Sequence, residues 1–354
     1  MPVAIETSRG LMVAGLRGTG RSLYVINPLA VSRYRDRYSV TRKKSDHADA
    51  VVLANIIRTD IHAHRPLPAD GELVQAIAVL ARAQQDAVWN RQQLVNQLRS
   101  LLREYYPNFL TAFATREGGL RRPDARAVLA TAPTPGQAAA LSLARLRTAL
   151  TRGGRRRGID AEAARLKSIF ATQQLRQLPL VEEAMGRQAL ALLRQLDAAC
   201  QAADNLAEAS GTAFGQHPDA QIIASFPGLG EIAGARILAE IGDDRTRFAD
   251  ARALKAYAGS APVTRASGKT IHVFTRKVKN QRLAAAGYVW AFASLTASPP
   301  ARIHYDRRRQ AGDRHVAAQR NLFNRLLGCL HHCLTTGQTY DPAKAFPTPA
   351  AAAA

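Results

Sequence analysis

A serine followed by a glycine stands inside a run of basic residues. Ser267-Gly268 is flanked by Arg265 and Lys269, and the basic run continues with Arg276, Lys277, Lys279 and Arg282. A hydroxyl that attacks phosphorus needs cations to hold the phosphate and to stabilise the developing charge. An ordinary turn beside a solvated basic face has the same composition. The residues alone therefore leave two interpretations open, a nucleophilic serine in a basic loop and a plain turn.

Two aspartates and one glutamate are spaced as ligands of a metal ion. Ser45 is placed to cap a helix from Asp46 to Arg58, so Asp46 and Asp49 lie at i and i+3 on one helical face. Glu6 ends the first apolar run of the chain and supplies a third carboxylate. Oxygen ligands of this kind suit Mg²⁺, which leaves coordination positions free for phosphate oxygens. The alternative is that both aspartates only complement the helix dipole.

The segment FPGLGEIAGARILAEIGD has the pattern of a helix-hairpin-helix. Gly228 and Gly230 form a tight turn between an apolar helix end and a second helix. That second helix is expected to bury Ile232, Ala235, Ile237, Leu238 and Ile241. Glycines let backbone N–H groups approach a phosphate, and the following helix points the positive end of its dipole at that anion. The sequence predicts a nucleic-acid contact at this turn.

The charge of the chain agrees with a polyanionic partner. The 354 residues carry a formal net charge of +22, most of it from arginine, which binds phosphate in a bidentate manner. DNA or RNA is the expected partner, although a ribosomal or nucleoid protein would share this charge. The three cysteines do not suggest a disulfide framework, and Cys329-Leu-His-His-Cys333 lies in a periodic helix without a second ligand pair. We expect no membrane span, because no apolar run is long enough, and we expect no signal peptide.

The elements that position these residues fall into four segments. Residues 1–67 read as a small α/β domain, 72–215 as long helices with a basic linker at 150–158, and 219–342 as a mainly helical C-terminal domain. The low-complexity tail, 343–354, is expected to be disordered.

Residues 72–106 carry an unbroken heptad seam. Its members are Leu73, Ile77, Leu80, Gln84, Ala87, Arg91, Leu94, Leu98, Leu101 and Tyr105. The spacing predicts a coiled coil, and a core-facing helix of a bundle is the alternative.

In their order these motifs resemble the DEDD transposases of insertion-sequence family 110, also described as bridge-RNA-guided recombinases. VAIETSRG looks like the family's second acidic motif, RKKSDHADAVVLA like the third, and FPGLGEIAGARILAEIGD through ASGKT and TRKVKNQRL like the C-terminal transposase domain. The resemblance places the family's Glu at Glu6, its two Asp at Asp46 and Asp49, and its nucleophilic serine at Ser267.

The resemblance implies an architecture and a reaction. It implies an incomplete RuvC-like (RNase H) domain, coiled-coil helices and a C-terminal domain that holds the serine. It further implies that the carboxylates bind Mg²⁺ while Ser267 attacks a DNA phosphate. The implied partners are DNA, a structured guide RNA and further copies of the chain in a dimer or tetramer, at a cytoplasmic, nucleoid-associated location.

The chain departs from the family pattern in three places. The family's first Asp lies upstream of its Glu motif, whereas this chain begins almost at that motif, so we expect an N-terminal truncation. Gly259-Ser260-Ala261-Pro262 replaces Gly-Leu-x-Pro, and Lys279 stands where Gly is usual. Two hypotheses follow, a DNA recombinase of the transposase type and a catalytically dead nucleic-acid-binding remnant.

Overall fold

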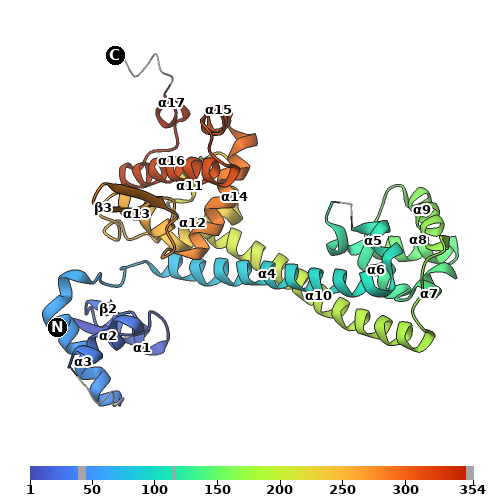
Figure 1. Ribbon diagram of the computed structural model, residues 1–354, viewed down its shortest axis with the longest axis horizontal. Coiled ribbons are helices and arrows are strands. Elements are labelled where there is room, and N and C mark those ends of the chain that lie inside the picture. The colour runs from blue at the N-terminus through green and yellow to red at the C-terminus, as the bar shows by residue number, and fades with distance from the viewer. Residues whose placement is uncertain (39–44, 115–116, 348–354) are drawn as a thin grey trace. The chain divides into compact units, whose positions relative to one another are not determined.

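The computed structural model describes residues 1–38, 45–114 and 117–347 (Figure 1). Arg42, Lys43 and Lys44 of the third acidic motif lie outside the described residues. The chain divides into two compact units, one formed by residues 1–71 with 242–249 and the other by residues 72–241 with 250–354.

The first unit is a small α/β domain. Its elements are β1 (Val3–Ile5), α1 (Leu11–Gly18), β2 (Leu23–Val25), α2 (Pro28–Tyr38), α3 (Asp46–Asp60) and the 3-10 turn η1 (Ile61–Ala63). β1 and β2 pair in parallel, with Val3 opposite Leu23 and Ile5 opposite Val25. Parallel strands need a crossover, which α1 provides. The α/β prediction for the first segment is confirmed in its element order.

Helix α3 packs on the strands through its apolar positions. Val52 and Ile56 are buried in a cluster with Ile26 and Val31, and Ala4 of β1 packs against it. Ser45 caps the helix, since its hydroxyl accepts the N–H of Ala48 at 3.2 Å. The predicted helix start is therefore confirmed, and Asp49 lies one turn before the residues that contact the sheet.

Residues 242–249 belong to this unit although they are distant in sequence. The Asp244 carboxylate accepts the N–H of Ala69 at 2.9 Å, and the Asp243 carboxylate accepts the N–H of Gly71 at 2.9 Å. The predicted domain boundaries at residues 67 and 219 did not include residues 242–249 in the first unit.

Over its described residues, the second unit is helical apart from one hairpin. Its first elements are α4 (Glu72–Tyr105), α5 (Pro107–Phe113), η2 (Gly119–Arg121), α6 (Pro123–Thr131), α7 (Pro135–Ala139), α8 (Leu143–Arg152), α9 (Ile159–Ala171) and α10 (Pro179–Gly215). Then follow α11 (Ala220–Ala224), α12 (Glu231–Ile241), α13 (Ala251–Ala258), β3 (Val263–Ser267), β4 (Thr270–Phe274), α14 (Gln281–Ala297), α15 (Pro299–Gln310), α16 (His315–Thr336) and α17 (Pro342–Ala345).

The long helices α4 and α10 lie antiparallel along one another within the chain (Figure 1). Leu94, Leu98 and Leu101 of the heptad seam are buried in one core with Leu193 and Leu196 of α10. The seam is thus occupied by a helix of the same chain, which agrees with the bundle alternative. A coiled coil between copies through this seam stays a prediction without support from the buried side chains.

Two other predicted segments are more ordered than expected. In the basic linker 150–158, Arg155 pairs with buried Asp124 at 3.1 Å and with Glu162 at 3.9 Å, so this stretch is an integral turn between α8 and α9. In the predicted disordered tail, residues 343–345 belong to α17 and Ala345 is buried. The first part of the tail was therefore predicted wrongly, because Asp341 caps a short helix whose last residue packs inward. Residues 348–354 lie outside the described residues.

Candidate functional site

Ser267 ends β3 at the tip of a β-hairpin. β3 and β4 pair antiparallel, with Ser267 opposite Thr270 and the two-residue turn Gly268-Lys269 between them. Gly268 has φ +57°, the left-handed conformation that such turns require and glycine adopts freely. The loop predicted for Ser267 is thus a hairpin, and the serine side chain is exposed at its end.

The register of the hairpin gives its two faces different chemistry. Alternate residues share a face, so Ser267 lies on the same face as Thr270, Arg265 and His272. Two ring contacts agree with this arrangement: Arg265 lies 5.7 Å from the centre of the Phe274 ring, and His272 lies 5.9 Å from it. The serine therefore lies on a face that carries a guanidinium and an imidazole together with the Phe274 ring.

The other face of the hairpin is apolar and uncovered. Ile271 and Val273 project from it and are 68% and 64% exposed. Such exposure on both sides of a two-stranded ribbon is unusual for a single folded chain, since a lone hairpin is only marginally stable in water. The hairpin therefore leaves these two apolar side chains open to solvent.

A partly buried polar network anchors the end of the segment that carries the hairpin. The Asn280 amide donates to the Glu240 carboxylate and to the Tyr257 hydroxyl, both at 2.6 Å, and its backbone N–H donates to the Tyr257 carbonyl at 2.8 Å. Arg82 of α4 donates to the same Glu240 at 2.7 Å. Residues of α12 and α13 thus meet at Asn280, which also caps α14 by accepting the N–H of Leu283. Arg82 joins α4 to this network through Glu240. Sequence reasoning missed this network, because its members are far apart in the chain.

The predicted DNA-contacting cations separate into two groups. Arg265, Lys269 and Lys277 are exposed on or beside the hairpin. The other three are partly buried: the Arg276 guanidinium donates to the Ala261 carbonyl at 3.4 Å, and the Lys279 side chain lies over Gly259.

Arg282, the third of these, is engaged inside the chain. Its guanidinium donates to the Asp86 carboxylate at 2.8 and 2.9 Å and to Gln85 at 3.1 Å, and it lies over the Trp89 ring at 5.3 Å. These contacts link α14 to α4. A DNA contact by Arg282 stays a prediction, and the structure gives the residue a packing role.

The two glycines of the predicted helix-hairpin-helix lie between α11 and α12, but their environments differ. Gly228 has φ +79°, and a Cβ there would lie 2.8 Å from the backbone nitrogen of Ser294 in α14. Its conformation thus serves close packing against α14. Gly230 is exposed with open space beside it, directly before the first N–H groups of α12. Only Gly230 therefore remains available to approach a phosphate.

The second helix of this pair follows the predicted apolar pattern with one exception. Ala235, Ile237, Leu238 and Ile241 are buried as expected, whereas Ile232 is 40% exposed. Ile232 lies in the first turn of α12, at the open end beside Gly230.

The three predicted metal ligands lie in the first unit, and the structure does not gather them into a metal site. Glu6 directly follows β1, and Asp46 and Asp49 begin α3, which packs against β1. The Asp49 carboxylate is instead paired with the guanidinium of Arg35 from α2. Over the described ranges, no group of three His, Cys, Asp or Glu side chains is placed to hold a metal ion. As they stand, the three carboxylates do not fit Mg²⁺.

Comparison with known proteins matches two separate segments of the chain. Residues 3–107 match a transposase family model, the DEDD type of IS110, and residues 220–306 match the model described as the IS116/IS110/IS902 transposase family. No helix of the described residues is long and apolar enough to cross a membrane.

Curated relatives extend the match over nearly the whole chain. The "Mini-circle putative transposase for IS117" of Streptomyces coelicolor is 65% identical over 98% of this chain and 84% of its own length. The IS900 42 kDa protein of Mycobacterium paratuberculosis is 31% identical over 96% of this chain and 84% of its own length. The IS116 44.8 kDa protein of Streptomyces clavuligerus is 30% identical over 94% of this chain and 81% of its own length. The chain therefore belongs to the IS116/IS110/IS902 family of transposases, enzymes that recombine DNA.

Proposed function

We propose that this transposase cuts and rejoins DNA through a covalent link between Ser267 and a DNA phosphate. The observation that carries the proposal is the position of Ser267 at the exposed tip of a basic hairpin, on the face that also bears Arg265 and His272. An exposed tip reaches a backbone phosphate without a cleft, and Arg265 and Lys269 supply positive charge beside the hydroxyl.

The proposed step is a transesterification at phosphorus. The Ser267 oxygen forms a bond to phosphorus as the bond from phosphorus to one deoxyribose oxygen breaks. The hydroxyl proton leaves the serine, and the released deoxyribose oxygen gains a proton. Rejoining reverses the step with the hydroxyl of another strand as the attacking group. The covalent intermediate conserves the bond energy for that second transfer.

The proposal for partners rests on charge and on the uncovered apolar face. A net charge of +22 favours DNA together with a structured guide RNA, and it supports a nucleoid-associated location. The exposed Ile271 and Val273 favour a homo-oligomer, a dimer or tetramer, in which a second copy covers the hairpin. The α4 seam is filled within the chain, so the hairpin is the better candidate for this contact.

Participation of Mg²⁺ stays a prediction. The bound ion would supply charge neutralisation at the transferring phosphate. Asp49 would first have to exchange Arg35 for that ion. The same ion pair favours the alternative of a catalytically dead, nucleic-acid-binding remnant. With Asp49 paired to Arg35, only Glu6 and Asp46 of the three predicted ligands remain for a metal ion.

One experiment separates the two proposals. Wild type and Ser267→Ala are incubated with labelled donor and target DNA and guide RNA, and the products are resolved on a denaturing gel. We expect a protein–DNA adduct and recombinant product with wild type only, at equal DNA affinity for both proteins. Thr270→Ala is the matched control, because Thr270 carries a hydroxyl opposite Ser267 across the same turn, and this variant should retain adduct formation.

The outcomes are distinct. Recombinant product from Ser267→Ala at the wild-type rate would show that the serine is not the nucleophile. DNA binding by wild type with neither adduct nor product would support the remnant.

A further inference from the structure

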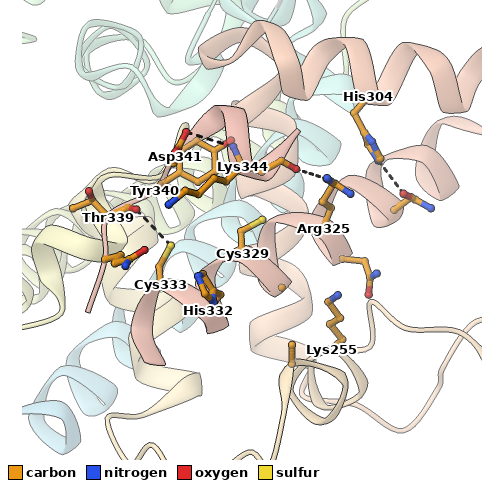
Figure 2. A pocket seen from close by; sticks show the side chains of 16 residues that line it. Lys255, His304, Arg325, Cys329, His332, Cys333, Thr339, Tyr340, Asp341 and Lys344 are labelled. Atoms are coloured by element: carbon orange, nitrogen blue, oxygen red, sulfur yellow. Dashed lines mark hydrogen bonds between the residues drawn. The ribbon is translucent and has the colours of Figure 1, made fainter. Parts of the chain in front are cut away.

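A cavity of about 580 Å³ lies between α13, α16 and the C-terminal segment that ends in α17 (Figure 2). It is formed by elements other than the hairpin that carries Ser267. Its cationic side chains are Lys255 of α13, Arg325 of α16 and Lys344 of α17, and Asp341 is the carboxylate that lines it. Three cations against one carboxylate leave a net formal charge of +2.

That carboxylate is already used to cap α17. Asp341 accepts the backbone N–H of Ala343 at 2.9 Å and that of Lys344 at 3.4 Å. Neither Lys255 nor Arg325 is paired with a carboxylate in the part of the chain that the structure describes. The cavity therefore carries an excess of positive charge, and its carboxylate, Asp341, is bonded to backbone N–H groups.

The two cations are held in place by their surroundings. Arg325 donates from Nε to the Ala345 carbonyl and lies 5.2 Å from the centre of the Phe346 ring, which fixes the plane of its guanidinium. Lys255 crosses α16 at Gly328, where a Cβ would lie 2.7 Å from the ammonium nitrogen. The absence of a side chain at Gly328 thus makes room for the ammonium group.

Both cations also lie near the thiol of Cys329. Burial raises the pKa of Cys329, and the charges of Arg325 and Lys255 act in the opposite direction. Both cations therefore act on the same part of the cavity, beside Cys329.

We propose that this cavity binds a phosphate monoester of a nucleotide, with Lys255 and Arg325 as its cationic ligands. A guanidinium of fixed plane and an ammonium group match the oxygens of a phosphate. The volume falls within the range of about 300–1,000 Å³ that is usual for small-ligand sites. The monoester can come from the 5′ end of a nucleic-acid strand or from a free mononucleotide.

Two assays on the full chain distinguish these sources. Calorimetry compares AMP with adenosine, and fluorescence anisotropy compares two labelled oligonucleotides that differ only in a 5′-phosphate or a 5′-hydroxyl. We expect the phosphorylated member to bind more tightly in at least one assay. Preference for AMP identifies a free nucleotide, and preference for the 5′-phosphate without AMP binding identifies a strand end.

The variants test the named ligands. Lys255→Gln should reduce that preference about ten-fold or more, as expected for loss of one charge-assisted hydrogen bond. Arg252→Gln is the matched control, because Arg252 is exposed on the same helix and does not line the cavity. Gly328→Ala retains every charge but displaces the Lys255 ammonium, and it should also weaken binding.

The proposal is overturned if wild type does not distinguish the phosphorylated from the unphosphorylated ligands. It is equally overturned if Lys255→Gln and Arg252→Gln lose the same affinity. Thermal melting checks that the variants fold; should Lys255→Gln be unfolded, Gly328→Ala, which displaces the Lys255 ammonium group, takes its place. Ser267→Ala should bind like wild type, so failure of the serine chemistry leaves this test unaffected.

Discussion

The guanidinium of Arg35 is paired with the carboxylate of Asp49 where α2 packs against α3. The side chains of both residues are largely shielded from solvent, at 17% and 18% exposure. The ion pair gives one of the three predicted metal ligands a cationic partner from its own unit. A divalent ion at Asp49 would therefore have to displace the Arg35 guanidinium.

Arg35→Gln should therefore increase the affinity of the chain for Mg²⁺. Removal of the guanidinium leaves Asp49 without its counter-ion, and a divalent cation can then replace it. Calorimetric titration with MgCl₂ measures the effect, with weak binding expected for wild type. Arg33→Gln, an exposed cation on the same helix, is the control and should leave the titration unchanged. An identical titration for Arg35→Gln and wild type would contradict a metal site that includes Asp49.

Arg282→Gln should affect the stability of the chain, whereas Lys277→Gln should affect its binding to DNA. Arg282 is bonded to Asp86 and Gln85 of α4, so its loss should lower stability by about 1 kcal/mol and leave the salt dependence of binding unchanged. Lys277 is exposed, so its loss should leave the melting temperature unchanged and reduce the slope of log affinity against log salt by about 1. Thermal melts and binding titrations at several salt concentrations measure both. A reduced slope of log affinity against log salt for Arg282→Gln would show that Arg282 contacts DNA.

Substitution of Gly228 should lower stability, whereas substitution of Gly230 by a large residue should weaken DNA binding. Gly228→Ala places a side chain at φ +79° against the backbone of α14, which should cost about 2 kcal/mol or more. Gly230→Ala has open space and should melt like wild type. Gly230→Leu should also fold but should weaken DNA binding by blocking the start of α12. Unchanged affinity of a folded Gly230→Leu protein would remove this turn from the interface.

Asp124→Asn should destabilise the chain in a pH-dependent manner. Burial by itself raises the pKa of Asp124, but hydrogen bonds from Arg122 and Arg155 and the charge of Arg122 outweigh it, so the folded-state pKa lies below the ordinary value of 3.8. The carboxylate therefore stabilises the fold fully above pH 3.8, and this contribution is lost as the pH falls below that value.

At neutral pH the variant should lose about 3 kcal/mol, because the guanidinium groups of Arg122 and Arg155 lose an ionised partner at a buried position. The difference from wild type should narrow as the pH falls below 3.8. Thermal melts over a pH series measure it, and Asp160→Asn, whose side chain is 81% exposed, is the control. A constant difference at all pH values would contradict the assigned cause.

Local signals in the sequence determined several elements correctly. The Ser45 cap and the apolar spacing after it predicted α3, because a capping hydroxyl and the helical period act within a few residues. The same applies to the long helix α4 and to the start of α12 after Gly230. The hairpin at Ser267 was not predicted, because its strands are only five residues each and polar and apolar residues alternate in the second strand alone.

Only the tertiary structure decided which groups meet. The partner of the α4 seam is α10 of the same chain, and the partner of Asp49 is Arg35, neither of which the spacing of residues specifies. The network around Asn280 and the cavity beside Lys255 join residues separated by tens of positions in the chain. Helix period and capping are set by neighbours along the backbone, whereas these contacts depend on how distant helices pack.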